Sequence, residues 1–231
     1  MSTVHSTATD RRHDGGIPPS AARRALDVLA ATALLMLLVP AFLAVAAAVK
    51  LSGPGPVLYR QPRVGQGGRP FLLLKFRSMR AGSTGPAVTA GGDPRVTRVG
   101  AVLRRTSLDE LPQLWHVLWG TMTLVGPRPD TLPLAARYPT DCRWVLDHRP
   151  GLTGPAQLYL RDAATIGTGI DDVEAYYLAH LVPRRVALDA TYLRRPTVRR
   201  TVWFCLLTAA DVLGLRSRPG PAGPVRRTGS I

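Results

Sequence analysis

Two adjacent carboxylates, Asp109 and Glu110, are the most chemically informative residues in this 231-residue sequence. They follow Arg104 and Arg105 and precede Pro112, a residue suited to the first turn of a helix. A carboxylate beside guanidinium groups and a helix N-terminus is expected to stay ionised. Such a group suits nucleophilic attack or metal binding better than acid catalysis. Adjacent acids can also divide the work, one attacking phosphorus while the other holds Mg²⁺.

The same residues fit a purely structural alternative. Ser107 and Glu110 match the S-x-x-E pattern of a helix capping box, in which each side chain satisfies a backbone N–H at the start of a helix. From the spacing alone, capping is the more common interpretation.

Cations elsewhere in the sequence are candidate phosphate contacts. Pro127 and Pro129 flank Arg128 and would fix its backbone, which aims the guanidinium at little entropic cost, although a proline-rich turn with a solvated arginine fits equally well. Lys75 and Arg77 alternate at the end of an apolar strand, where they could bind phosphate or simply face solvent.

The composition predicts an anionic partner. Thirty Lys and Arg against 15 Asp and Glu give a net charge of +15, which suits nucleic acid, acidic lipid headgroups or phosphorylated substrates. An aromatic content of 6% is low for a protein that stacks on bases, so nucleic acid is not expected. Arginine forms forked phosphate contacts, but a GC-rich genome would enrich it too. The two cysteines, Cys142 and Cys205, have no metal or disulfide spacing and fit a reducing compartment.

Residues 28–49 carry no charge over 22 positions, the length of a membrane-spanning helix. Pro40 near the middle predicts a bend. Positive residues flank both ends, and the positive-inside rule places both flanks on the cytosolic side, which favours a re-entrant helix over a single kinked span. A buried soluble helix is less favoured because the segment has no polar face. The flanking cations are Arg11, Arg12, Arg23, Arg24, Lys50, Arg60, Arg63 and Arg69.

Four regions are expected along the chain: a disordered tail (1–20), the membrane re-entrant helix (21–51), a cytosolic catalytic domain (52–215) and a flexible tail (216–231). The domain is predicted to be α/β, mostly helical with a few short strands. Strands are expected at 57–59 and 71–74, a loop at 81–94, a turn at 151–155, and helices at 95–105, 112–119, 133–147, 171–180, 184–194 and 197–213.

Six ordered motifs carry a resemblance to a known family, among them Ser-Leu-Asp-Glu-Leu-Pro-Gln-Leu at 107–114 and Leu-Val-Gly-Pro-Arg-Pro at 124–129. The chain resembles the bacterial sugar transferases, the small monotopic phosphoglycosyl transferases, from about residue 24 to 213. The other four motifs lie at 50–57, 75–79, 93–98 and 149–154.

The resemblance implies a ping-pong reaction on the cytosolic face of a bacterial plasma membrane. Asp109 would attack the β-phosphate of a UDP-sugar and release UMP, and a polyprenyl (undecaprenyl) phosphate would then take the sugar phosphate, which initiates exopolysaccharide or glycoconjugate synthesis. Glu110, with Asp109, would bind Mg²⁺. The implied substrate-binding residues are Lys75, Arg77, Arg104, Arg128, Pro129, Arg161 and Asp189.

Three departures from the family pattern leave the catalytic pair intact. Val39 precedes Pro40 where the family often has Ser, His116 and Thr121 replace an Asn and an acidic residue, and Pro155 takes a frequent Trp position. A competing hypothesis is a non-catalytic, basic membrane-associated or nucleic-acid-binding protein. The sugar, the glycan pathway and the oligomeric state, including a homo-oligomer, are left open.

Overall fold

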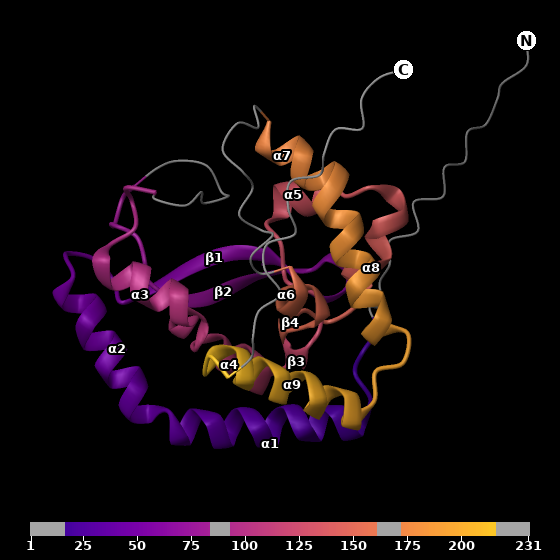
Figure 1. Cartoon of the computed structure of the whole chain (residues 1–231), viewed down its shortest axis with the longest axis horizontal. Coiled ribbons are helices and arrows are strands. Elements are labelled where there is room, and N and C mark those ends of the chain that lie inside the picture. The colour runs from indigo at the N-terminus through magenta and orange to yellow at the C-terminus, as the bar shows by residue number, and fades with distance from the viewer. Residues whose placement is uncertain (1–16, 84–92, 161–171, 216–231) are drawn as a thin grey trace, which may run out of the picture.

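The computed structural model describes residues 17–83, 93–160 and 172–215, and it is mostly helical with short strands, as expected (Figure 1). Within this part, the strands form two separate two-stranded sheets. The helices are α1 (Ala21–Leu37), α2 (Val39–Leu51), α3 (Arg98–Thr106), α4 (Gln113–Trp119), α5 (Leu132–Ala136), α6 (Pro155–Tyr159), α7 (Val173–Tyr176), α8 (Val182–Leu193) and α9 (Val198–Val212), and the strands are β1 (Leu58–Val64), β2 (Pro70–Phe76), β3 (Thr123–Val125) and β4 (Gly151–Thr153).

The apolar N-terminal segment is a bent pair of helices. α1 ends at Leu37 and α2 begins at Val39, with Pro40 in its first turn and a bend of 62° between them. The bend at Pro40 is therefore confirmed, because proline lacks an N–H and its ring clashes with the carbonyl four residues earlier. In the described part of the chain, no single helix is long and apolar enough to cross a membrane, although the bent pair passes that test by length and composition.

β1 and β2 form an antiparallel ribbon that carries Lys75, one of the predicted site residues. The register pairs Tyr59 with Lys75 and Arg63 with Phe71. Side chains alternate between faces along a strand, so Tyr59, Gln61 and Arg63 share one face with Lys75. The ribbon is longer than the sequence indicated, because its outer residues are polar or exposed and lack a hydrophobic signal.

β3 and β4 form a small parallel pair whose second strand was expected to be a turn. Gly126 follows β3, and Gly151 opens β4. A Cβ on Gly151 would lie 2.0 Å from the Gly126 nitrogen, so only glycine permits this approach. The close contact fixes the start of the 126–129 loop.

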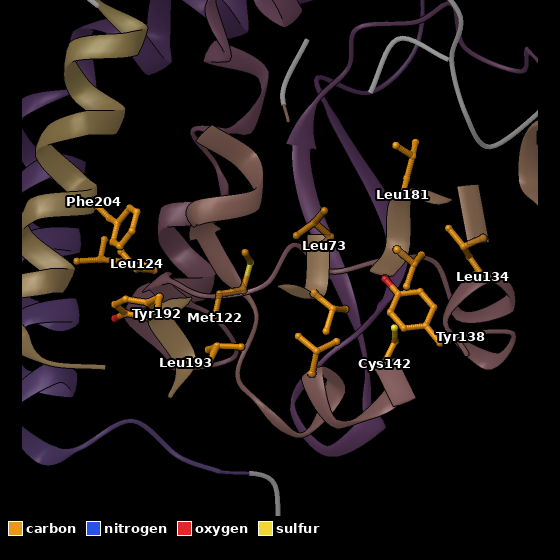
Figure 2. Packing of buried hydrophobic residues seen from close by; sticks show 14 of the residues in the cluster. Leu73, Met122, Leu124, Leu134, Tyr138, Cys142, Leu181, Tyr192, Leu193 and Phe204 are labelled. Atoms are coloured by element: carbon orange, nitrogen blue, oxygen red, sulfur yellow. The ribbon is translucent and has the colours of Figure 1, made fainter. Parts of the chain in front are cut away.

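A single main core lies beneath these elements (Figure 2). Leu73 of β2, Met122 and Leu124 around β3, Tyr192 of α8 and Phe204 of α9 all contribute to it. A smaller cluster packs Val45 and Val49 of α2 against Phe76 and Leu103. The end of α2 therefore joins the domain through apolar contacts.

Two helix predictions differ from the structure. The helix expected at 133–147 is split, because Pro139 separates α5 from a 3-10 helix at Thr140–Asp147. The helix expected at 171–180 is the short α7 followed by a π-helical turn, Tyr177–Leu181. Nearly all of the two predicted tails and much of the 81–94 loop lie outside the described residues, so the four-region division stays a prediction.

Candidate active site

The predicted catalytic pair, Asp109 and Glu110, lies in the tight turn η2, Leu108–Glu110, between α3 and α4. Ser107, which ends α3, has a left-handed backbone with φ of 59°, and it is the only non-glycine residue with positive φ in the described part of the chain. Residues held in this region are strained and concentrate at functional sites. The Ser107 side chain makes no capping hydrogen bond to this turn, so that half of the capping box is not formed, and the Ser107 N–H donates to the Arg104 carbonyl at 3.3 Å.

Asp109 is 8% exposed. Burial raises the pKa of its carboxyl above the usual value, and the charge of Glu110 adds to the increase. Three cations, those of Lys75, Arg104 and Arg128, act in the opposite direction but do not outweigh burial. The three cations favour the ionised form as expected, but the net shift of the Asp109 pKa is upward because desolvation, which the sequence does not reveal, is the larger effect.

Glu110 and Arg128 form an ion pair across the site. Arg128 Nη2 donates to Glu110 Oε1 at 2.7 Å, with 42% of the arginine side chain and 24% of the glutamate side chain exposed. The charge of Glu110 raises the pKa of Arg128, so the guanidinium stays protonated. Arg128 is thus aimed at the catalytic turn and does not project freely into solvent.

Lys75 approaches the same turn from β2. Its Nζ lies 5.3 Å from the centre of the Tyr59 ring, a cation–π contact across the ribbon. Burial, followed by the positive charge of Arg63, lowers the pKa of Lys75 to about 8, although Asp109 acts against this. The structure therefore brings Lys75 together with the carboxylates.

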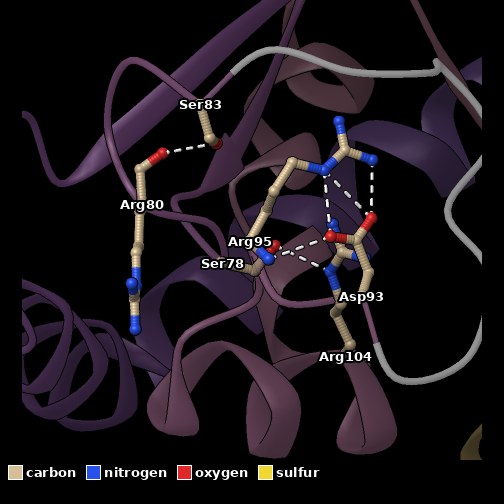
Figure 3. Close-up of polar contacts among 6 residues, drawn as sticks. All are labelled: Ser78, Arg80, Ser83, Asp93, Arg95 and Arg104. Atoms are coloured by element: carbon tan, nitrogen blue, oxygen red, sulfur yellow. Dashed lines mark hydrogen bonds and ion pairs between the residues drawn. The ribbon is translucent and has the colours of Figure 1, made fainter.

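Arg104 is held in place by Ser78, which is buried (Figure 3). Arg104 Nε donates to Ser78 Oγ at 2.8 Å. A Cβ on Gly100 would lie 1.9 Å from the Ser78 carbonyl oxygen, so this glycine lets α3 approach the end of β2. In the same view Arg95 donates to Asp93 and lowers the pKa of that carboxyl to about 2.

Arg77 is engaged elsewhere. Its guanidinium donates to the carbonyls of Val49, Gly53 and Pro54 at 2.6–2.8 Å, and the side chain is buried. These bonds satisfy carbonyl groups at and beyond the end of α2. The contacts assign Arg77 a structural role, and its assignment to substrate binding gains no support from them.

Pro129 and Asp189 border a small cleft beside Arg128 that is also lined by Arg185. Burial raises the pKa of Asp189 to about 7, although the Ala156 N–H donates to its Oδ1 at 3.0 Å. Arg161, the remaining predicted site residue, lies outside the described residues.

A buried acid, Asp130, lies next to this cleft and was not predicted from the sequence. The hydroxyl groups of Tyr138 and Tyr177 both donate to its Oδ2, and Arg185 lies 3.8 Å away. The acid directly follows the 126–129 loop, and its backbone oxygen accepts from the Val64 N–H at 2.9 Å. This cluster therefore holds the loop from behind.

Arg63 is a second site residue that the sequence did not reveal as such. It was expected only as a charge flanking the membrane helix. Its Nη1 donates to the Pro129 carbonyl at 3.1 Å, and its charge acts on Lys75. The signal for it is the alternation of side chains along β1: Tyr59, Gln61 and Arg63 point to one face, and Tyr59 pairs with Lys75 on that face.

His116 has a structural role on α4. Its Nε2 accepts from the Leu74 N–H at 3.1 Å, its Nδ1 lies 3.0 Å from Thr121 Oγ1, and its ring packs against Trp119. Burial lowers its pKa, so the ring is neutral and can accept at Nε2. His116 and Thr121, two of the residues that depart from the family pattern, are therefore hydrogen-bonded to each other.

The carboxylates fit a hard divalent cation that shares its coordination with substrate. Among the described residues no three acidic, histidine or cysteine side chains are grouped to hold a metal ion. Mg²⁺ commonly uses one or two carboxylates and completes its shell with phosphate oxygens and water. Asp109 and Glu110 supply that smaller set.

The profile of the bacterial sugar transferase family matches residues 19–214. The chain belongs to this family. The match covers both helices of the bent α1–α2 pair and every predicted site residue that the structure describes.

Three relatives show what the proteins similar to this chain are called. The chain is 42% identical over 197 residues to the UDP-glucose:undecaprenyl-phosphate glucose-1-phosphate transferase of Caulobacter vibrioides, covering 83% of this chain and 69% of the relative. It is 42% identical over 187 residues to the Escherichia coli protein of the same name, covering 79% and 37%. An exopolysaccharide production protein of Rhizobium leguminosarum is 43% identical over 145 residues, covering 59% and 72%. This transferase thus spans well under half of the E. coli relative.

Proposed function

We propose that this transferase moves a sugar phosphate from a UDP-sugar to undecaprenyl phosphate or a similar polyprenyl phosphate. The observation that carries the proposal is one buried carboxylate, Asp109, on which Lys75, Arg104 and Arg128 all act. The names of the relatives support the donor and acceptor classes. The name of the Rhizobium relative supports a role in exopolysaccharide production.

In the first step, a carboxylate oxygen of Asp109 attacks the β-phosphorus of the donor. The bond from that phosphorus to the bridging oxygen breaks, and UMP leaves with the electron pair. Phosphoryl transfer depends on positioning and charge neutralisation more than on proton transfer. Lys75, Arg104 and Arg128 supply three positive charges for the diphosphate and the departing UMP.

In the second step, a phosphate oxygen of the polyprenyl phosphate attacks the phosphorus held on Asp109. The bond between phosphorus and the carboxylate oxygen breaks, which restores Asp109 and gives a polyprenyl diphosphate sugar. The attack on Asp109 requires the ionised acid, and the raised pKa means that this form is lost at a higher pH than for an ordinary aspartic acid.

Glu110, with Asp109, would hold Mg²⁺ in this proposal. The ion, when bound, neutralises charge on the diphosphate oxygens. Glu110 already orients Arg128 through their 2.7 Å ion pair, so the same carboxylate links the metal site to the arginine that faces the donor.

The bent α1–α2 pair is proposed to enter the cytosolic leaflet and return. α4 and α9 lie beside α1 (Figure 1), and Trp115, Trp119 and Trp203 are exposed on them. Tryptophan is enriched where membranes meet water, so these exposed side chains support the proposal that this surface contacts the bilayer. A site at that level receives a lipid phosphate without lifting its chain from the membrane.

The test is a UMP-release assay on the full chain in detergent, with Mg²⁺, polyprenyl phosphate and a panel of UDP-sugars that begins with UDP-glucose. We expect release with at least one donor and none above background for Asp109→Asn. Absence of release across the panel, together with nucleic-acid binding that falls steeply with salt, would instead favour the non-catalytic alternative.

A further inference from the structure

Arg63 lies on the strand face that carries Lys75. β1 alternates exposed Arg60 and Pro62 with half-buried Gln61 and Arg63, and the inner pair shares its face with Lys75. The strand therefore delivers a second cation to the site from the same ribbon.

The guanidinium of Arg63 is fixed at both of its terminal nitrogens. Nη1 donates to the Pro129 carbonyl at 3.1 Å, and Nη2 donates to Gln61 Oε1 at 2.8 Å. Gln61 thus orients the plane of the guanidinium, and Pro129 is the residue directly after Arg128. The bond ties β1 to the loop that aims Arg128 at Glu110.

The burial of Arg63 is costly for the fold. Its Nε is buried and has no hydrogen-bond partner among the described residues. Desolvation and the charge of Arg128 both lower its pKa, while Asp130 and Glu110 oppose this. A cation that is partly unsatisfied and lies near a like charge is a poor means of stabilising a protein. Its position is better explained by the site.

We propose that Arg63 is a positioning residue for phosphosugar transfer, which holds the 126–129 loop so that Arg128 meets Glu110 and the donor diphosphate. The inference rests on the proposed function. Arg63 acts through Arg128, and its effect belongs to the step in which the UDP-sugar reacts. The acceptor step is not expected to depend on it.

The test is a double-mutant cycle on the full chain, measured as kcat/KM for the UDP-sugar in the UMP-release assay. We expect Arg63→Gln to lower this value by about tenfold to a hundredfold, as for the loss of a hydrogen bond from a charged group, and Arg63→Lys to recover part of the loss. In an Arg128→Gln background, Arg63→Gln should cost less than about threefold. kcat/KM for the polyprenyl phosphate, which reports the second half-reaction alone, should stay within about twofold.

Arg60→Gln is the matched control, because Arg60 lies on the same strand with its side chain exposed on the opposite face. It should leave kcat/KM within about twofold of the unsubstituted protein. If Arg63→Gln fails to fold, Arg63→Lys alone and with Arg128→Gln forms the same cycle.

Two results would overturn the inference while the proposed function stands. One is that Arg63→Gln leaves kcat/KM for the UDP-sugar unchanged. The other is that Arg63→Gln lowers this value as much in the Arg128→Gln background as in the unsubstituted protein. No UMP release by the unsubstituted protein would overturn the proposed function, and this inference with it.

Discussion

At the scale of single residues, the site combines one buried acid, Asp109, with cations that differ in how far they are buried. Asp109 is almost fully covered, whereas Arg128 remains 42% exposed in its side chain. The exposed part of the guanidinium, which is paired with Glu110, is accessible to a diphosphate, while the covered acid reacts only with a group brought into contact. The adjacent acids were readable from the sequence, but the direction of the Asp109 pKa shift was not, because burial is a property of the fold.

Lys75 gives the first pH prediction. An amine whose pKa is lowered to about 8 loses its positive charge as the pH rises through that value. We therefore expect kcat/KM for the donor to fall above about pH 8, since kcat/KM reports groups in the free enzyme. Lys75→Arg should retain the charge and move the decline to higher pH. An unchanged alkaline limb in that variant would remove Lys75 from the explanation.

Asp189 gives a prediction about stability. Its pKa in the folded protein, about 7, exceeds that of an exposed aspartic acid, so the folded state binds the proton more tightly than the unfolded state. The unfolding free energy should therefore fall, by on the order of 4 kcal/mol, as the pH rises from about 4 through about 7. Asp189→Asn should lose this part of the pH dependence. Denaturant unfolding at a series of pH values measures it, and parallel curves for the two proteins would contradict it.

At the scale of elements, the first two turns of α1 hold α4, which follows the Asp109–Glu110 turn, and β3, which precedes the 126–129 loop. Arg24 donates to the carbonyls of Val117 and Leu118 at the end of α4, at 2.6 and 2.7 Å. Asp27, fully buried, accepts from Thr123 Oγ1 and the Leu124 N–H of β3.

The sequence presented Arg24 only as a flanking charge, because long-range partners leave no local pattern. Helices with strong local signals, such as 112–119, were predicted well, whereas β3 and β4 depend on tertiary pairing.

Arg24→Gln should therefore disturb the catalytic turn through α4. We expect it to destabilise the protein by about 1–3 kcal/mol, the range for hydrogen bonds from a charged group, and to lower the UMP-release rate. Thermal unfolding in detergent and the rate assay measure the two effects. Arg69→Gln is the control, because that side chain is exposed and is one of the cations on the other flank of the apolar segment. Equal effects of the two substitutions would show that only net charge matters.

At the scale of the whole molecule, the bent pair α1–α2 and the exposed tryptophans suggest one surface for the bilayer. The bend is a property of Pro40 that the sequence predicted, but the docking of α1 onto α4 and α9 comes only from tertiary packing. In the proposed arrangement, the site would lie at the level of the lipid headgroups.

Topology can be measured by cysteine labelling of Pro18→Cys and Leu51→Cys variants, both at exposed positions, the first just before the bent pair and the second at its last residue. Cys205 is replaced by Ala, and Cys142 is buried. A membrane-impermeant maleimide should label both positions from the cytosolic side of oriented vesicles and neither from the other. Labelling of the two positions from opposite sides would indicate a span.

The most direct test of the central claim is intact-mass measurement of the full chain after incubation with a UDP-sugar and Mg²⁺ but no acceptor. The account predicts a mass increase of one phosphosugar, one equivalent of UMP released, and a modified peptide that carries Asp109, with no adduct on Asp109→Asn. An adduct on another residue, or full transfer to polyprenyl phosphate by Asp109→Asn, would contradict it.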